Sequence, residues 1–354
     1  MHFNKYQRQV MLPNFGEAAQ NKLARAHVLV IGAGGLGSPV LEYLTAAGVG
    51  TISVIDDDVV TPSNLHRQIV HGMPDVGRAK VASAKDRLDH LSGGDVKILP
   101  IEGRINAANA VALVGSADLV IDGADNFPTR YLVADTCKNL QKPLVWGSVL
   151  TFYAQVSVFL NGDDTPTLRD LFPAAPPEGT VPSCGEAGVI GALVGQAGTV
   201  MAMEAIKVLT GVGKTLAGSV LMVDALNAEF TKIPLRRRQG GQVSPPLSVH
   251  TCGANDEFPE ISVRDAKDRL GEFTPLDVRS ASEYAEGHLP GAINVPVGDI
   301  DEDAARALGE KNLLVYCESG PRAVRAGRIL VKYAKVTLLS GHYRAWRIEG
   351  KNNA

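Results

Sequence analysis

Two groups of residues in this sequence have the types and the spacing that binding and catalysis at an enzyme site require. The first runs from a glycine-rich turn at residues 32–37 through the polar stretch 63–68 to Lys80 and Asp125. The second is the run Cys317-Glu318-Ser319-Gly320-Pro321-Arg322. The first group can bind and neutralise phosphate, and the second offers a nucleophilic sulfur in a turn-forming loop. They predict an enzyme that cleaves a nucleotide and handles reactive sulfur.

The glycine turn follows an apolar stretch and precedes a helical pattern. Gly32, Gly34 and Gly35 let the backbone approach a phosphate, and the next helix N-terminus supplies oriented N–H groups. Asp56 ends the second apolar stretch, where a carboxylate can accept hydrogen bonds from both ribose hydroxyls. Such a turn opens many cofactor-binding folds, so by itself it does not separate a dehydrogenase from an ATP site.

Three further residues favour ATP over NAD. Arg67 and Lys80 can neutralise the charge that develops on a leaving pyrophosphate, and Asp125 can hold Mg²⁺ through a carboxylate oxygen. Each has a structural alternative: a surface salt bridge for Arg67, a helix-face charge for Lys80 and a helix N-cap for Asp125. Their occurrence in this order favours a triphosphate site, which we expect Asn64 and Asn126 to line as well.

The cysteine run has the features of a sulfur-transfer loop. Cys317 ends an apolar strand pattern, and successive backbone N–H groups in the following loop can stabilise a thiolate or persulfide. Arg322 adds positive charge. A second cysteine, Cys184, ends a loop just before a helical pattern, where a helix N-terminus would lower its thiol pKa. The alternative for Cys184 is a small buried apolar residue.

A parallel α/β sheet can bring the first group together. Short apolar runs alternate with amphipathic stretches from residue 26 to about 160, which predicts such a sheet. We expect strands at 28–31, 51–55, 96–101, 119–121 and 144–145, and helices at 38–47, 80–91, 107–114 and 130–140. A long loop is expected at 163–183, followed by a closely packed core helix at 189–209.

Length and composition limit the class of protein. A chain of 354 residues is expected to form about two domains, and the Gly- and Pro-rich break at 236–258 predicts a linker between domains 1–235 and 259–354. A net charge of −3 argues against nucleic acid as a partner. No apolar run approaches the roughly 20 residues of a membrane span. The four cysteines have no paired spacing, so we expect a cytoplasmic protein with free thiols.

Residues 1 to about 235 resemble the adenylyltransferases that activate ubiquitin-like sulfur carriers in molybdopterin and thiazole synthesis. The matching motifs are Tyr6-Gln7-Arg8-Gln9, the glycine turn, residues 63–68 and 77–80, and Asp125-Asn126 with Arg130. The resemblance implies a Rossmann-like doubly wound sheet with an adenylation subdomain. It also implies that ATP and Mg²⁺ adenylate a carrier's C-terminal Gly-Gly carboxylate. In that family the residue matching Arg8 reaches the neighbouring subunit's ATP site, which implies a homodimer, and the cysteine matching Cys184 links covalently to the carrier.

Residues 259–354 resemble the rhodanese fold, a small α/β domain. The match covers residues 276–279, 287–296 and 339–346, although the family often has glycine where His342 stands. Residues 317–322 have the six-residue length of a sulfurtransferase loop rather than the longer loop of the related phosphatases. The resemblance implies that Cys317 carries a persulfide whose sulfur comes from a cysteine desulfurase or thiosulfate.

This sequence departs from the adenylyltransferase family at the positions of a structural zinc site. The family usually holds a structural zinc with two Cys-x-x-Cys pairs, and this chain has Thr167 and Asp170, then Val249 and Cys252, at those positions. Because a structural zinc site needs about four good ligands, even with His250 as a substitute we expect no zinc.

Two other functions remain as alternatives. One is an NAD-dependent oxidoreductase with a regulatory rhodanese-like domain, and the other is a scaffold whose rhodanese domain only docks partners. The sequence leaves the pathway open among thiamine, molybdopterin, tRNA thiolation and cysteine synthesis.

Overall fold

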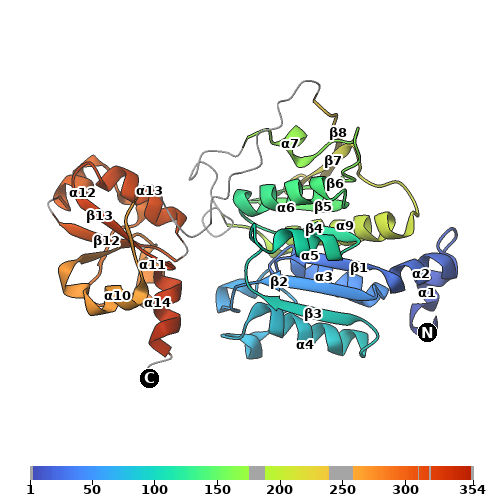
Figure 1. Cartoon of the computed structure of the whole chain (residues 1–354), viewed down its shortest axis with the longest axis horizontal. Coiled ribbons are helices and arrows are strands. Elements are labelled where there is room, and N and C mark those ends of the chain that lie inside the picture. Colours follow the sequence, from blue (N-terminus) through green and yellow to red (C-terminus); the bar gives the residue numbers. More distant parts are fainter. Residues whose placement is uncertain (1–2, 175–187, 239–257, 310, 319, 352–354) are drawn as a thin grey trace. The chain divides into compact units, whose positions relative to one another are not determined.

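The computed structural model describes residues 3–174, 188–238, 258–309, 311–318 and 320–351. The chain forms two compact units: the described residues up to 238 lie in the first, and those from 258 lie in the second (Figure 1). The expected linker at 236–258 falls largely outside the described residues, so its exact limits stay a prediction.

The first unit is built on an eight-stranded sheet with the order β3-β2-β1-β4-β5-β6-β7-β8. Its strands are β1 (His27–Ile31), β2 (Thr51–Asp56), β3 (Lys97–Glu102), β4 (Leu119–Asp122), β5 (Leu144–Leu150), β6 (Tyr153–Phe159), β7 (Ser219–Asp224) and β8 (Glu229–Pro234). The five strands expected from the sequence are all present and pair in parallel, which confirms the Rossmann-like α/β fold. The strand order reverses at β1, and ligands of such sheets bind at this switch point.

The sheet is not entirely parallel, which corrects the sequence-based expectation. Strands β6, β7 and β8 extend it in antiparallel fashion. β5 and β6 form a hairpin whose turn contains Thr151 in a left-handed conformation, with φ of 54°. Since this turn lacks glycine and proline, the sequence pattern did not separate the two strands.

The helices of the first unit are α1 (Gln7–Val10), α2 (Gly16–Arg25), α3 (Gly37–Ala47), α4 (Lys80–Ser92), α5 (Ala110–Ser116), α6 (Phe127–Asn139), α7 (Leu168–Leu171) and α9 (Gly191–Thr210). Two of them start three residues away from the expected position, and the cause is local. α5 begins three residues late because Asn106 and Asn109 bind backbone N–H groups in the preceding turn. α6 begins three residues early because Asn126 caps it. In addition, α7 interrupts the loop expected at 163–183.

Helix α9 lies in the core, as expected. Within the described ranges it is the one helix long and apolar enough to cross a membrane by composition, yet it packs against α2, α3, β5 and β6. Its Gly198 allows the close approach to α3, because a Cβ there would lie 2.3 Å from Cγ of Pro39. Leu193, Val194 and Met201 are buried in the same cluster of side chains.

The second unit has a five-stranded parallel sheet in the order β11-β10-β12-β13-β9. Its elements are β9 (Glu260–Ile261), α10 (Val263–Asp268), β10 (Thr274–Asp277), α11 (Ala281–Ala285), β11 (Ile293–Asn294), α12 (Glu302–Ala307), β12 (Asn312–Tyr316), α13 (Pro321–Leu330), β13 (Lys335–Leu339) and α14 (His342–Lys351). Both sheet faces are buried: Leu313 and Val315 pack with α12 and α13, whereas Leu314 and Tyr316 pack with α10 and α14. β12, the central strand, leads directly to Cys317.

Candidate functional site

The glycine turn lies between the carboxyl ends of β1, β2 and β4. Gly32 has φ of 92° and its N–H donates to the carbonyl of Ile55 in β2, at 2.9 Å. On the other side, the N–H of Gly123 after β4 donates to the carbonyl of Ile31, at 3.0 Å. Gly37 admits no side chain, because a Cβ there would lie 1.9 Å from the carbonyl oxygen of Gly32. The turn is therefore a tightly fixed backbone cradle.

Asp56 is held against this cradle. Its Oδ2 accepts a hydrogen bond from the N–H of Ala33 at 2.8 Å, and its Oδ1 accepts one from the N–H of Asp58 at 2.7 Å. Burial raises the pKa of Asp56, and the nearby ammonium of Lys80 works in the opposite direction. The predicted ribose acid thus lies beside the predicted phosphate turn.

His71 contacts the carbonyl of the same residue, Ala33, and was not predicted. Its Nε2 lies 3.0 Å from the carbonyl oxygen of Ala33, and its Nδ1 lies 2.8 Å from Oγ of Ser83 in α4. Because a carbonyl only accepts, Nε2 carries the proton, and burial lowers the pKa of the imidazole. A lone histidine in a polar stretch follows no pattern, so only the structure reveals this link.

Lys80 is a buried residue rather than a helix-face charge. Its side chain is 5% exposed at the start of α4, and Nζ lies 2.9 Å from Oδ2 of Asp58. Asp58, which was not predicted, belongs to a group of three carboxylates, Asp56 to Asp58, that lie within 4.8 Å of one another. Each already has a protein partner: Asp56 binds the glycine turn, Asp57 pairs with Arg104 and Asp58 pairs with Lys80.

Arg67 lies against the glycine turn through its aliphatic stem. A Cβ added at Gly35 would lie 3.5 Å from Cγ of Arg67. Its Nη1 donates to the carbonyl of Ser63 at 3.0 Å and contacts Nε2 of His66, and no carboxylate pairs with it in the described ranges. The alternative that Arg67 forms a surface salt bridge is therefore wrong within the part of the chain that the structure describes. Asn64 has a local role, because its Oδ1 accepts from the N–H of Thr61 at 3.0 Å.

The loop after β4 carries the remaining nucleotide-site candidates. Asn126 is the N-cap of α6, since its Oδ1 accepts from the N–H of Thr129 at 3.0 Å. Asp125 is exposed and is not the cap, so that alternative is wrong. The loop meets the glycine turn, because a Cβ at Gly32 would lie 3.4 Å from the carbonyl oxygen of Gly123.

Asp122 at the end of β4 is a further unpredicted member of this region. It is fully buried, and its Oδ1 accepts from the N–H of Ala124 at 2.9 Å. Its Oδ2 has no hydrogen-bond partner among the residues that the structure describes. Burial raises the pKa of this carboxyl to about 6, although Arg130 lowers it in part.

Arg8 does not join this group within its own chain. It is exposed on α1, and its neighbour Gln9 binds the carbonyl of Ala47 at the C-terminus of α3, at 3.2 Å. The glycine turn lies at the other end of α3, which has 11 residues and is therefore about 16 Å long. Arg8 thus lies at the opposite end of this helix from the cradle.

In the second unit, Cys317 is fully buried directly after β12. Its Sγ accepts a hydrogen bond from the N–H of Gly320 at 3.0 Å, as expected for a loop that stabilises a thiolate. Arg322 does not stand alone, because its Nη1 and Nη2 lie 2.6 Å and 2.8 Å from the carboxylate of Glu283. Burial would raise the pKa of Glu283, but hydrogen bonds from Arg322 and Ser280 lower it to about 2.

The second charged residue of this loop, Glu318, is paired as well. Its Oε2 lies 3.3 Å from Nη1 of Arg279, and its Oε1 lies 3.6 Å from Nη2 of Arg347. Arg279 is itself buried and forms a bidentate pair with Asp277. Ion pairs therefore hold both charged side chains of the loop.

Some predicted residues lie outside the described part. Cys184, Val249, His250 and Cys252 belong to segments that the structure does not describe. At the other expected zinc positions, Asp170 accepts hydrogen bonds from the N–H and Oγ1 of Thr167, at 2.8 Å and 3.0 Å. These two residues form the N-terminal capping box of α7.

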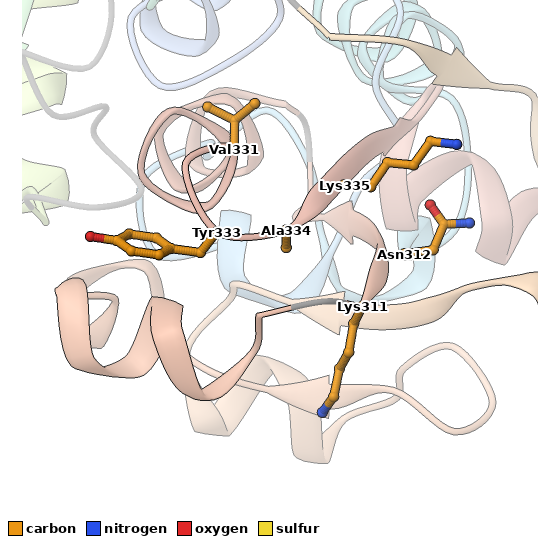
Figure 2. Close-up of a pocket in the computed structure, with 6 residues that line it drawn as sticks. All are labelled: Lys311, Asn312, Val331, Tyr333, Ala334 and Lys335. Carbon is orange, nitrogen blue, oxygen red and sulfur yellow. The ribbon is translucent and has the colours of Figure 1, made fainter.

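A surface pocket in the second unit is not part of the cysteine site. Figure 2 shows its lining residues, Lys311, Asn312, Val331, Tyr333, Ala334 and Lys335. They lie at the beginnings of β12 and β13, whereas Cys317 follows the end of β12. At about 3.3 Å per residue, the extended segment from Lys311 to Cys317 spans roughly 20 Å.

Comparison with known proteins identifies a family for each of the two units. Residues 6–243 match the ThiF family, and residues 262–349 match the rhodanese-like domain. The chain is 39% identical to the probable adenylyltransferase/sulfurtransferase MoeZ of Mycobacterium tuberculosis, over 97% of this chain and 92% of that protein. It is 49% identical to the sulfur carrier protein adenylyltransferase of Thermus thermophilus, over 66% of this chain and 88% of that protein.

Solved structures show the same fold for the first unit. Escherichia coli MccB matches with a TM-score of 0.60 and 20% identity, over 69% of this chain and 73% of that chain. Membership of an adenylyltransferase family implies the use of ATP, so the dehydrogenase alternative is not favoured. The chain belongs to the ThiF family, and it joins an adenylyltransferase unit to a rhodanese-like sulfurtransferase unit.

Proposed function

We propose that the chain adenylates the C-terminal Gly-Gly carboxylate of a ubiquitin-like sulfur carrier and then delivers sulfur to it. The observation that carries the proposal is one connected cradle in the first unit. Asp56, Arg67 and His71 contact the glycine turn, and Lys80 lies on the helix that His71 links to it. The sulfur function rests on the hydrogen bond from the loop backbone to the Cys317 sulfur.

Each residue of the cradle has a role in this proposal. The turn binds the phosphates, Asp56 binds the ribose, and Asn64 and Asn126 line the site. Arg67 and Lys80 neutralise the pyrophosphate as it leaves. Asp125 fits Mg²⁺, because its carboxylate is exposed and the helix cap does not use it. The metal would supply charge neutralisation at the phosphates.

The first reaction is an acyl activation. A carboxylate oxygen of the carrier attacks the α-phosphorus of ATP, the bond from this phosphorus to the bridging oxygen breaks, and pyrophosphate leaves with its electron pair. The carboxylate becomes an acyl-adenylate, whose good leaving group allows attack by sulfur.

The second reaction transfers sulfur. Cys317 first accepts a sulfane sulfur from a cysteine desulfurase or from thiosulfate, and its persulfide then attacks the acyl-adenylate, releasing AMP. The product is an acyl disulfide. The thiolate of Cys184 attacks the Cys317 sulfur, so the carrier leaves as a thiocarboxylate and a Cys184–Cys317 disulfide remains. A dithiol reductant must then reduce this disulfide.

We propose a homodimer in which Arg8 completes the site of the other subunit. Arg8 lies at the far end of α3 from its own cradle, which supports a role for its guanidinium in the site of a neighbouring copy. Beside it on the surface, Met11 and Leu12 are 67% and 55% exposed, which suits an apolar contact between subunits.

We further propose that the chain holds no structural zinc and acts in the cytoplasm. Of the residues at the four zinc positions, Thr167 and Asp170 cap a helix and only Cys252 is a thiol. The choice of carrier, and therefore of pathway, stays open among the four named above.

Two variants test the division of labour. C317S is expected to keep carrier-dependent exchange of pyrophosphate into ATP and to lose thiosulfate sulfurtransferase activity. K80A is expected to lose the exchange by at least about 100-fold, as typical for loss of a charge-stabilising group, and to keep sulfurtransferase activity. Loss of both activities in either variant, in a protein that remains folded, would contradict the proposal.

A further inference from the structure

His342 has two features that a residue with only a packing role does not need. It adopts a left-handed backbone conformation, with φ of 55°, which residues other than glycine rarely do. Its Nδ1 is buried and has no hydrogen-bond partner among the described residues. Burial also lowers the pKa of its imidazole to about 4, so the ring is neutral near pH 7. Such features persist where surrounding structure enforces them, often at functional sites.

The imidazole of His342 packs against the cysteine loop at Gly320. A Cβ added to Gly320 would lie 3.0 Å from Nε2 and 3.4 Å from Cδ2 of His342. The ring therefore occupies the side of Gly320 on which other residues carry a side chain. Gly320 has φ of 120°, a conformation that residues with a side chain rarely adopt, and its N–H is the group that donates to Sγ of Cys317.

The chain around His342 is anchored to the same loop. The N–H of Tyr343 donates to the carbonyl oxygen of Cys317 at 2.9 Å. The preceding Ser340 is fixed as well, because its N–H donates to the carbonyl of Ile261 at 2.8 Å. The start of α14 thus holds the imidazole in a set place relative to both Cys317 and Gly320.

We propose that His342 is a positioning residue of the sulfur-transfer site: it fixes the Gly320 peptide so that its N–H stabilises the Cys317 thiolate. A glycine has no side chain to restrict its own peptide, so neighbouring groups help to set the direction of its N–H. A hydrogen bond to the charged form of a thiol favours that form. The inference rests on the proposed function, in which the Cys317 thiolate accepts sulfur.

The two charged side chains of the loop are held by ion pairs. Glu318 is paired with Arg279 and Arg347, and Arg322 is paired with Glu283. These pairs tie the side chains of the loop to other elements, whereas the imidazole of His342 lies beside Gly320, where a Cβ would stand.

The test compares His342→Gly and His342→Asn with the wild-type full chain. Glycine accepts the left-handed backbone without strain and removes the ring, whereas asparagine tolerates this conformation and keeps a polar side chain near Gly320. The first measurement is the rate of Cys317 alkylation by iodoacetamide against pH, followed by mass spectrometry of the peptide that contains Cys317. The others are kcat and KM with thiosulfate, and the urea midpoint of unfolding.

We expect H342G to lower the alkylation rate at pH 7 and kcat by about tenfold each, as for loss of a hydrogen bond to a charged group. KM for thiosulfate should stay within about twofold, and the unfolding midpoint should stay equal or rise, since strain is relieved. H342N should recover part of the rate. Greater stability with lower reactivity is a result that a purely structural role does not produce.

Unchanged alkylation in H342G would overturn the proposal, and so would a loss of reactivity that only accompanies a lower unfolding midpoint. Failure of the proposed function would give a different experimental result. In that case C317S would keep sulfurtransferase activity, whereas the alkylation comparison reports on the thiol itself whether or not the chain transfers sulfur.

Discussion

At the scale of single residues, Asp122 is a carboxyl group in an environment that differs strongly from water. Its carboxyl lies fully buried at the end of β4, and burial raises its pKa from 3.8 to about 6. The ionised form therefore destabilises the folded state above pH 6, and this cost decreases as the pH falls from 6 towards 3.8. Perturbed carboxyls at strand ends are common in active sites, which agrees with its place beside Asp125.

The variant D122N tests this electrostatic cost. Asparagine keeps the acceptor for the N–H of Ala124 and cannot ionise. From pH 7 to pH 5, the wild type should gain about 1 kcal/mol of unfolding free energy relative to D122N, from the linkage between the two pKa values. Urea unfolding can be followed by the fluorescence of buried Trp146, which pairs with Asp122 across β4 and β5, in a W346F background. Parallel pH curves for the two proteins would show that Asp122 titrates normally.

The sequence predicted site residues that stand at recognisable positions, such as the end of a strand or the start of a helix. It did not reveal residues whose roles depend on contacts with parts of the chain far away in sequence. Asp56 ends a strand and Lys80 begins a helix, so the places of both residues could be inferred from the sequence. Asp58 and His71 are recognisable only from contacts across 22 and 38 residues of chain, to Lys80 and Ala33. Arg322 was expected to add positive charge to the loop, and its pairing with Glu283 could be recognised only from the fold.

At the scale of elements, the glycine turn and α3 form the rigid part of the nucleotide site. Gly37 opens α3, and a Cβ there would overlap the carbonyl oxygen of Gly32, which is backbone and cannot move aside. G37A should therefore distort the turn, raise KM for ATP at least about tenfold and lower the unfolding free energy by about 2 kcal/mol, as for other overpacked sites.

G195A is a matched control for this variant. Gly195 lies in α9, where an added Cβ would meet no atom within 4 Å. The change should leave KM for ATP unaltered and increase the unfolding free energy by up to about 1 kcal/mol, because alanine favours helix. Pyrophosphate exchange and urea unfolding of both variants make the comparison. Equal KM values for G37A and wild type would show that the turn does not bind the phosphates.

Hydrophobic periodicity predicted where helices and strands begin, except where polar side chains bind the backbone of the first turn. The five parallel strands and helix α4 lie within one or two residues of their expected starts, because burial sets their patterns. α5 and α6 each shift by three residues, since asparagine side chains decide where the first turn begins. The antiparallel strand β6 went unrecognised because the hairpin turn at Thr151 carries no glycine or proline, and the turn at residues 225–228 between β7 and β8 lacks both as well.

At the scale of the whole molecule, the homodimer proposal makes each nucleotide site a product of two chains. A complementation experiment tests this directly. R8A and K80A are each expected to be inactive in pyrophosphate exchange when alone. After the two proteins are mixed and allowed to exchange subunits, one site of each heterodimer contains both native residues, so roughly a quarter of wild-type activity should return. No recovery in samples shown to contain heterodimers would contradict a role of Arg8 between subunits.

The sequence could indicate two domains and a likeness to two families, and both were found. Two-domain organisation follows from a break in composition, which is a local property of the chain. The proposed contribution of one subunit to another came from the resemblance around Arg8 and not from such a break. The place of Arg8 at the far end of α3, which only the folded unit reveals, supports that proposal.

In the proposed function, one chain both activates a carrier and supplies its sulfur. The most direct measurement is mass spectrometry of a small Gly-Gly carrier incubated with MgATP, thiosulfate, a dithiol reductant and the enzyme. The wild type should replace one carboxylate oxygen of the carrier by sulfur, and this product should require ATP. C317S should yield acyl-adenylate without thiocarboxylate. A thiocarboxylate formed without ATP, or formed equally well by C317S, would contradict the account.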